Sequence, residues 1–125
     1  MSPLPASSEH MAGGEACAVE RALSGHRSRR FPAGPLRSAA VLLPLVEPEP
    51  GAPLDLLFIQ RSERVPSHAG QVAFPGGTSQ SGDGGRTATA LREAHEEVGL
   101  PPHRVEIIGR LDDMITITGF HVRPV

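Results

Sequence analysis

The stretch Arg92-Glu93-Ala94-His95-Glu96-Glu97-Val98-Gly99-Leu100 carries most of the information in this chain. Successive residues of a helix rotate by about 100°, so Glu93, Glu96 and Glu97 converge on one face. Carboxylates at this spacing repel one another, and a hard divalent cation held by oxygen ligands offsets the repulsion. The pattern predicts either a cation-binding helix face or an ordinary solvated acidic helix.

The same stretch belongs to a helix predicted from about Arg86 to Val98. Its opposite face carries residues at i, i+4, i+7 and i+11 spacing that predict a core-facing stripe: Thr87, Leu91, Ala94 and Val98. Gly99 provides a C-cap, and the two prolines at 101 and 102 prevent continuation. The helix is therefore expected to be anchored on one side and acidic on the other.

Outward from this helix the chain alternates short apolar runs with turns rich in Gly and Pro. The expected elements are a short helix near 15–23, strands over 39–46 and 54–61 that neighbour each other, a short strand within 70–77, a third long strand over 105–111, and a fourth over 115–125 turned by Gly119. A polar Gly-rich loop over 79–85 leads into the acidic helix. The pattern is typical of an α/β domain.

Composition limits the function classes. Of 125 residues, 14 are Gly and 13 are Pro, so much of the chain must be loop or tail. A formal net charge of -2 argues against a nucleic-acid-binding surface, and no apolar run approaches the roughly 20 residues of a membrane span. The single cysteine, Cys17, cannot form an internal disulfide, which favours a cytoplasmic location.

The pattern Arg-Glu-(apolar)-x-Glu-Glu-x-Gly-(apolar), met throughout 92–100, resembles the Nudix box of the Nudix hydrolase superfamily. Upstream, Arg61-Ser62 and the run from Gly70 to Gly77 resemble the additional signature of its coenzyme A diphosphatases. Two positions depart from these patterns. Gly84 stands where the box has a Glu, so either Asp83 serves in its place or that ligand is dispensable. Pro66 stands where the subfamily signature usually has Arg.

The resemblance implies the Nudix α/β/α sandwich with a mixed β-sheet. It covers about residues 37–125, which we expect to form a Nudix domain, after a flexible N-terminal extension over 1–36 that contains the short helix. That architecture usually takes roughly 130 residues or more, so a C-terminally incomplete domain is expected.

The resemblance also implies a metal-dependent hydrolase of diphosphate linkages that uses Mg²⁺ or Mn²⁺. The implied substrate is coenzyme A or acyl-coenzyme A, which would give phosphopantetheine and adenosine 3′,5′-bisphosphate. Glu93, Glu97 and Glu96 are the expected metal ligands, and Glu93 and Glu96 are also catalytic candidates together with Arg92, which is expected to orient a glutamate.

Five further residues are expected to contact substrate: Arg61, Arg64, His68, Gly76 and Gly77. Guanidinium groups pair well with phosphate oxygens, and the glycines permit close backbone approach. Asp112 and Asp113 either approach the site as late acidic residues or cap a turn.

Two other functions remain open. One keeps the chemistry and changes the substrate to ADP-ribose, a nucleotide sugar, a dinucleotide or an oxidised nucleotide. The other is a Nudix-like module that binds a nucleotide without turning it over. In each case the expected partner is a small nucleoside diphosphate derivative, with no nucleic acid and no membrane, and a homodimer stays open.

Overall fold

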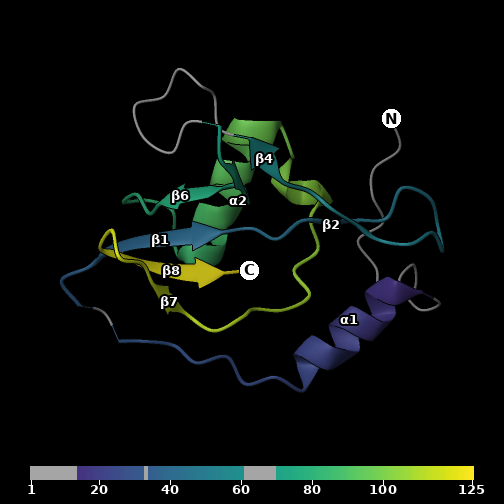
Figure 1. Cartoon of the computed structure of the whole chain (residues 1–125), viewed down its shortest axis with the longest axis horizontal. Helices are drawn as coiled ribbons and strands as arrows, with labels where there is room; N and C mark the ends of the chain where they lie inside the picture. The colour runs from purple at the N-terminus through teal and green to yellow at the C-terminus, as the bar shows by residue number, and fades with distance from the viewer. Residues whose placement is uncertain (1–13, 33, 61–69) are drawn as a thin grey trace.

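A four-stranded mixed sheet forms the centre of the molecule (Figure 1). The computed structural model describes residues 14–32, 34–60 and 70–125. The strands of this sheet, in the order in which they lie side by side, are β6 (Gly76–Thr78), β1 (Arg37–Val41), β8 (Phe120–Pro124) and β7 (Met114–Ile115). β1 and β8 run parallel, and the two outer pairs are antiparallel. The mixed sheet with its helices confirms the predicted α/β class.

Two small hairpins extend the architecture beyond this sheet. β2 (Leu45–Val46) pairs with β3 (Asp55–Leu56), and β4 (Ile59–Gln60) pairs with β5 (Val72–Ala73). The two strands expected over 39–46 and 54–61 are thus neighbours, as predicted, but each is divided into two short strands.

The division of the first strand follows from the backbone partners after β1. The Leu42 N–H donates to the Pro75 carbonyl and the Leu43 N–H to the Val125 carbonyl, each at 2.8 Å. Pro44 has no N–H to continue a ladder, and its carbonyl accepts from the Leu57 N–H instead. The chain therefore leaves the central sheet at this point and begins the β2–β3 hairpin.

α2 (Arg86–Val98) lies across one face of the sheet, against β1 and β6. Its buried side chains are small, with Ala90 and Ala94 completely buried, so the helix approaches the strands closely. Gly99 ends it in the left-handed conformation, at φ 70°, where its N–H donates to the His95 carbonyl. The predicted bounds and C-cap of this helix are confirmed.

Arg86 fixes the first turn of α2 to the sheet. Its Nη1 donates to the carbonyls of Ala39 on β1 and His121 on β8, and its Nη2 donates to the Ser38 hydroxyl. The start of the acidic helix is thereby tied to both parallel strands at the centre of the sheet.

α1 (Glu15–Ser24) confirms the short helix predicted near 15–23 and lies apart from the four strands in Figure 1. It packs against residues that follow the short 3-10 helix Pro102–Arg104, with Leu23 beside Gly109. A Cβ on Gly109 would lie 2.6 Å from Leu23 Cδ1, so this glycine permits close packing against α1.

The prediction of a strand over 105–111 is wrong, because these residues form no strand in the structure. Val105, Ile107 and their neighbours instead line an apolar cavity of about 350 Å³, together with residues of α1, β2 and β3. The apolar side chains that suggested a strand thus face α1 and the cavity, and their backbone does not pair in a sheet.

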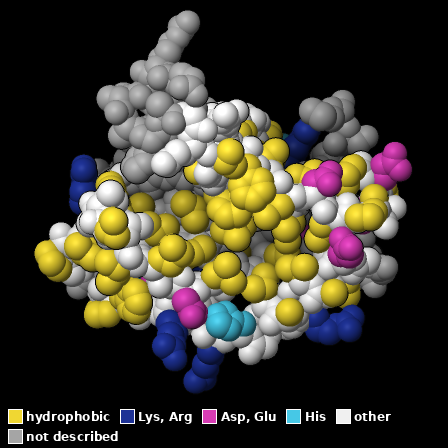
Figure 2. Space-filling view, viewed as in Figure 1, with side chains coloured by type: hydrophobic (Ala, Val, Ile, Leu, Met, Phe, Trp, Pro, Cys, Tyr) yellow, Lys and Arg dark blue, Asp and Glu magenta, His cyan; other side chains and the backbone are white. Residues whose placement is uncertain are grey.

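Apolar side chains are also widespread on the face of the molecule shown in Figure 2.

The final predicted strand is a hairpin, with Gly119 at φ 90° between β7 and β8. None of the helices in the described part of the chain is long and apolar enough to cross a bilayer.

Candidate active site

Arg92 is the organising side chain of the acidic face of α2. Its Nη1 donates to Glu93 Oε1 at 3.0 Å and to both oxygens of Glu96 at 3.2 Å. Its Nη2 donates to the carbonyl of Thr78 at the end of β6, at 3.0 Å. The expected contact between Arg92 and a glutamate is therefore present, and the same guanidinium joins the helix to the edge of the sheet.

Asp83, in the loop before α2, is the strongest partner of Arg92. Arg92 Nε donates to Asp83 Oδ1 at 2.8 Å and Nη2 donates to Oδ2 at 3.3 Å, while the Asp83 side chain is only 8% exposed. The Thr89 hydroxyl and the Gln80 N–H also donate to Oδ2. These donors, Arg92 foremost, hold the pKa of the Asp83 carboxyl well below its usual range.

Asp83 in turn raises the pKa of Arg92, so this pair stays ionised across the ordinary pH range. Sequence reasoning singled out Asp83 only as a substitute for the absent Glu at Gly84, and it missed Thr89. The available signal was an aspartate in a Gly-rich loop nine residues before the arginine. Gly82 and Gly84, at φ 96° and 82°, allow the loop to turn the carboxylate toward the helix.

Gly77 lies directly against the carboxylate of Glu93. A Cβ built on Gly77 would be 2.5 Å from Glu93 Cδ and 2.6 Å from Oε1, closer than side chains approach one another in proteins. The Glu93 side chain is 16% exposed, so its carboxylate is held between Arg92 and the backbone of β6. The expectation that Gly77 permits a close approach at the site thus has a definite partner in Glu93.

Gly76 has a different environment. Its Cβ position is blocked by the Ala40 carbonyl and by Val41 of β1, at 2.5 Å and 2.6 Å. This glycine is therefore required for packing between β6 and β1. The structure places its neighbour, rather than Gly76 itself, beside the acidic side chains.

The carboxylates of α2 have the donor chemistry for a hard divalent cation. Glu93 is largely buried, whereas the side chain of Glu96 is 56% exposed and Glu97 is exposed. Among the described residues, no three His, Cys, Asp or Glu side chains are already gathered as a set of metal ligands. Arg92 offsets part of the charge of Glu93 and Glu96, and the absence of a side chain at Gly77 leaves room for the Glu93 carboxylate against β6.

Three expected substrate contacts, Arg61, Arg64 and His68, lie outside the described residues, as does the departure at Pro66. Their assignment stays a prediction. His95 is exposed on α2, which agrees with the solvent-facing position that its place on the helix suggests.

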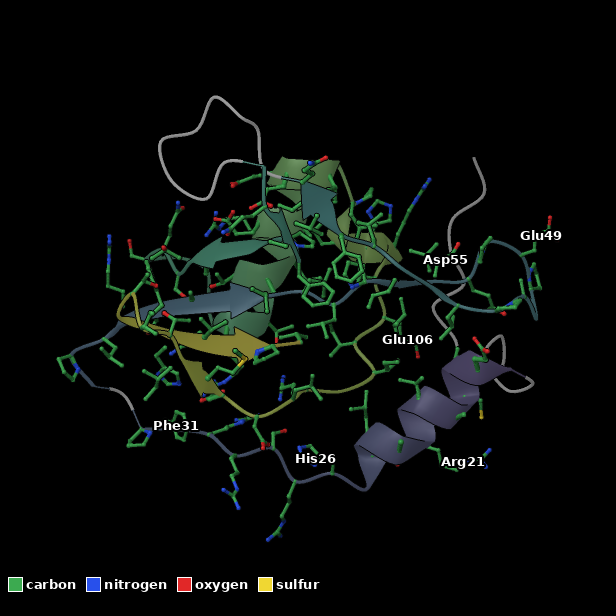
Figure 3. The ribbon with its side chains drawn as sticks, in the orientation of Figure 1. Arg21, His26, Phe31, Glu49, Asp55 and Glu106 are labelled. Carbon is green, nitrogen blue, oxygen red and sulfur yellow. The ribbon has the colours of Figure 1, made fainter. Side chains whose placement is uncertain are left out.

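Asp112 and Asp113 hold the N-terminal segment 26–31 in place. Asp112 Oδ1 accepts from the Arg29 N–H at 2.8 Å and lies 3.0 Å from His26 Nε2. Asp113 Oδ2 accepts from the Phe31 N–H at 3.0 Å, and the Asp113 N–H donates to the Arg29 carbonyl. Figure 3 shows His26 and Phe31 on this extended segment.

Asp113 also binds residues of β8. Its side chain, 1% exposed, receives hydrogen bonds of 2.8 Å from Arg123 Nε and Nη2 and lies 2.7 Å from His121 Nε2. Arg123, followed by His121 and the Phe31 N–H, holds the pKa of the Asp113 carboxyl well below its ordinary value. The hydrogen bonds of Asp113 thus join the N-terminal segment to β8, whereas those of the Asp112 side chain reach only the N-terminal segment.

Comparison with known proteins bears on this site. A model of the NUDIX domain matches residues 35–124. The chain is 54% identical over 90 residues to a protein of Citrobacter koseri named "Uncharacterized Nudix hydrolase NudL", a match that covers 71% of this chain and 45% of the relative. Proteins of the same name from Klebsiella aerogenes and Salmonella newport are 53% identical over 90 residues, which cover 71% of this chain and 72% and 45% of those relatives.

The chain spans about half the length of the Citrobacter and Salmonella relatives that it matches. The matched region includes the mixed sheet, the loop that carries Asp83 and the whole of α2. Because the family model covers well over half of the chain, this protein belongs to the NUDIX family.

Proposed function

We propose that the protein hydrolyses the diphosphate linkage of a nucleoside diphosphate derivative, and that coenzyme A or acyl-coenzyme A is its substrate. The products would be phosphopantetheine, or its acyl derivative, and adenosine 3′,5′-bisphosphate. The observation that carries the proposal is the packing of the Glu93 carboxylate against Gly77, beside an arginine that also binds Glu96.

The contacts of Glu93 suit catalysis because they restrict a reactive carboxylate without neutralising all of it. Arg92 donates to only one oxygen, Oε1, which leaves lone pairs on Oε2. Arg92 is itself fixed by Asp83 and by the Thr78 carbonyl. A carboxylate positioned by such supporting contacts is better suited to bind a cation, or to take a proton from water, than a freely rotating one.

Glu93, Glu97 and Glu96 would hold Mg²⁺ or Mn²⁺. A bound divalent ion neutralises diphosphate oxygens and lowers the pKa of water, the chemistry that hydrolysis of this linkage requires. Glu93 is the candidate general base, and Arg92 is a positioning residue that orients Glu93 and Glu96. Gly77 maintains the space in which the Glu93 carboxylate lies.

The coenzyme A assignment rests on the signature in the sequence, from Arg61-Ser62 through Phe74-Pro75-Gly76-Gly77. Part of that signature is described in the structure, where it forms the strand that contacts Glu93. Pro66, at the place of the usual arginine, favours a test against a second substrate. ADP-ribose serves well because it shares the adenosine diphosphate unit and lacks the pantetheine arm and the 3′-phosphate.

The test is product analysis by mass spectrometry after the protein is incubated with Mg²⁺ and either coenzyme A or ADP-ribose. We expect adenosine 3′,5′-bisphosphate and phosphopantetheine from coenzyme A, at a higher kcat/KM than for ADP-ribose. A preference for ADP-ribose would overturn the substrate assignment. Absence of hydrolysis of both would overturn the proposed activity.

Glu97→Gln tests the site within the same assay. Because Glu97 is exposed on α2, the substitution removes a ligand charge and leaves the core intact, so we expect turnover to be lost at an unchanged Tm. Glu49→Gln is the matched control, since Glu49 is also exposed but lies on the turn between β2 and β3 (Figure 3). Equal activities of the two variants would contradict the site.

A further inference from the structure

Two phenylalanine rings form a partly exposed pair on the β4–β5 hairpin. Phe58 directly precedes β4 and Phe74 directly follows β5, so continuation of the Ile59–Ala73 register places them opposite each other. Their ring centroids are 4.7 Å apart and their planes differ by 24°, which is a stacked arrangement. Phe58 is 50% exposed, so part of its surface remains open to solvent.

The pair is rigidly connected to the candidate active site. Phe74 is followed by Pro75, which is completely buried and whose carbonyl accepts from the Leu42 N–H at 2.8 Å. Gly77, which contacts Glu93, comes two residues later. Because three residues of chain span at most about 11 Å, the Cα atoms of Phe74 and Gly77 lie within that distance. The backbone of Phe74 thus lies within about 11 Å of the glycine that contacts Glu93.

Aromatic rings are scarce in this chain, which has four Phe and neither Trp nor Tyr. Phe31 lies 5.8 Å from the His121 ring, and Phe120 lies beneath the Arg37 guanidinium at 5.6 Å. The other two rings form the stacked pair, in the segment that leads to Gly77. A partly exposed phenylalanine lowers its free energy by stacking on a planar ligand, because such contact buries apolar surface and adds ring-to-ring attraction.

We propose that the exposed ring of Phe58, supported from behind by Phe74, is the platform on which the nucleobase of the substrate stacks. The inference rests on the proposed function, since it identifies the part of the nucleoside diphosphate that this hairpin recognises. Stacking uses the face of the base, which every base has, so this contact favours a nucleotide over a base-free diphosphate without reading the hydrogen-bonding edge.

Binding measurements with Phe58→Leu test the platform. Leucine retains an apolar side chain for packing on Phe74 but removes the aromatic face. The probes are ADP and inorganic pyrophosphate, each titrated by calorimetry in the presence of Mg²⁺. We expect Phe58→Leu to raise the Kd of ADP by about tenfold or more, while the Kd of pyrophosphate is unchanged.

Phe31→Leu is the matched control. Phe31 is 39% exposed and lies on the N-terminal segment, which Figure 3 shows below the sheet and away from β4. We expect this variant to bind ADP as the wild type does. Thermal unfolding of both variants establishes that each is folded before the affinities are compared.

Several outcomes would overturn the platform. These are an unchanged ADP affinity in Phe58→Leu, an equal loss of ADP and pyrophosphate binding, or ADP binding by the wild type no tighter than that of pyrophosphate. The hydrolysis assay is read separately. If the wild type hydrolyses no diphosphate but binds ADP in a manner that depends on Phe58, the proposed activity fails and the base platform stands.

Discussion

Gly77→Ala isolates the contact on which the candidate site depends. The new Cβ would lie 2.5 Å from Glu93 Cδ, whereas ordinary contacts begin near 3.4 Å. The Glu93 carboxylate must therefore move by about 1 Å, which also disturbs its hydrogen bond to Arg92. A displacement of this size at a reacting group costs about 100-fold in rate, so we expect kcat/KM to fall by that factor.

The same substitution should scarcely affect folding. The atoms that must yield are at the far end of a flexible side chain, and Gly77 is not among the glycines with positive φ. Alanine also reduces the entropy of the unfolded chain, so the free energy of unfolding should change by less than about 1 kcal/mol. The assay combines Mg²⁺-dependent hydrolysis of coenzyme A with Mn²⁺ affinity measured by electron paramagnetic resonance and with urea denaturation.

Gly76→Ala provides the contrast. Its Cβ would meet the Ala40 carbonyl and Val41 Cα, which are backbone atoms of β1 and cannot yield without moving the strand. We expect a loss of about 1–3 kcal/mol in the free energy of unfolding. The reasoning is refuted if Gly77→Ala keeps wild-type kcat/KM and Mn²⁺ affinity, or if it destabilises the fold as much as Gly76→Ala.

Two predictions concern the rest of the fold. Asp113→Asn breaks the buried pair with Arg123, so we expect it to lower the free energy of unfolding at pH 7 by about 3 kcal/mol in urea titrations. The pKa of Asp113 in the folded protein lies below the ordinary value of 3.8, so as the pH falls the unfolded chain takes up this proton first. The difference in the free energy of unfolding between wild type and variant should therefore shrink below about pH 4. A difference that stays constant down to about pH 3 would contradict the assignment. Gly99→Ala puts a side chain on a residue with φ 70°, so we expect it to lower the free energy of unfolding by about 1 kcal/mol. Gly25→Ala, at φ -86° after α1, should change it little. Equal effects of the two substitutions on Tm would count against the C-cap argument.

The acidic helix was predictable because its signals are local. Three glutamates on one face and Gly99 followed by prolines all lie within one short stretch, and α2 has the predicted bounds. The predicted core-facing stripe is only partly correct, because Ala94 is buried and Leu91 packs against the core but Val98 is exposed. The stretch over 105–111 was mispredicted because an apolar run has the same appearance whether it pairs in a sheet or faces a helix. Its environment depends on α1, which is about 90 residues earlier in the chain.

For the candidate site, too, local features could be predicted from the sequence and contacts between distant segments could not. The spacing placed the glutamates on one helix face, and the resemblance to the Nudix box identified them and Arg92 as site residues. The roles of Asp83 and Thr89, however, depend on the path of the loop between β6 and α2. The contact of Gly77 with Glu93 likewise depends on the distance between β6 and α2, which the sequence does not reveal. Metal binding and the substrate contacts of Arg61, Arg64 and His68 stay predictions.

The parallel pairing of β1 with β8 has a consequence for how the protein folds. Ala39 pairs with Val122, so the two central strands come from segments about 80 residues apart, and contacts of such long range slow folding. During synthesis β1 has no partner on its β8 side until residues 120–124 have left the ribosome, so the backbone N–H and C=O groups along this edge stay unpaired while α2 can already form. A nascent chain stalled before residue 120 should therefore be a better chaperone substrate than residues 1–125 released from the ribosome.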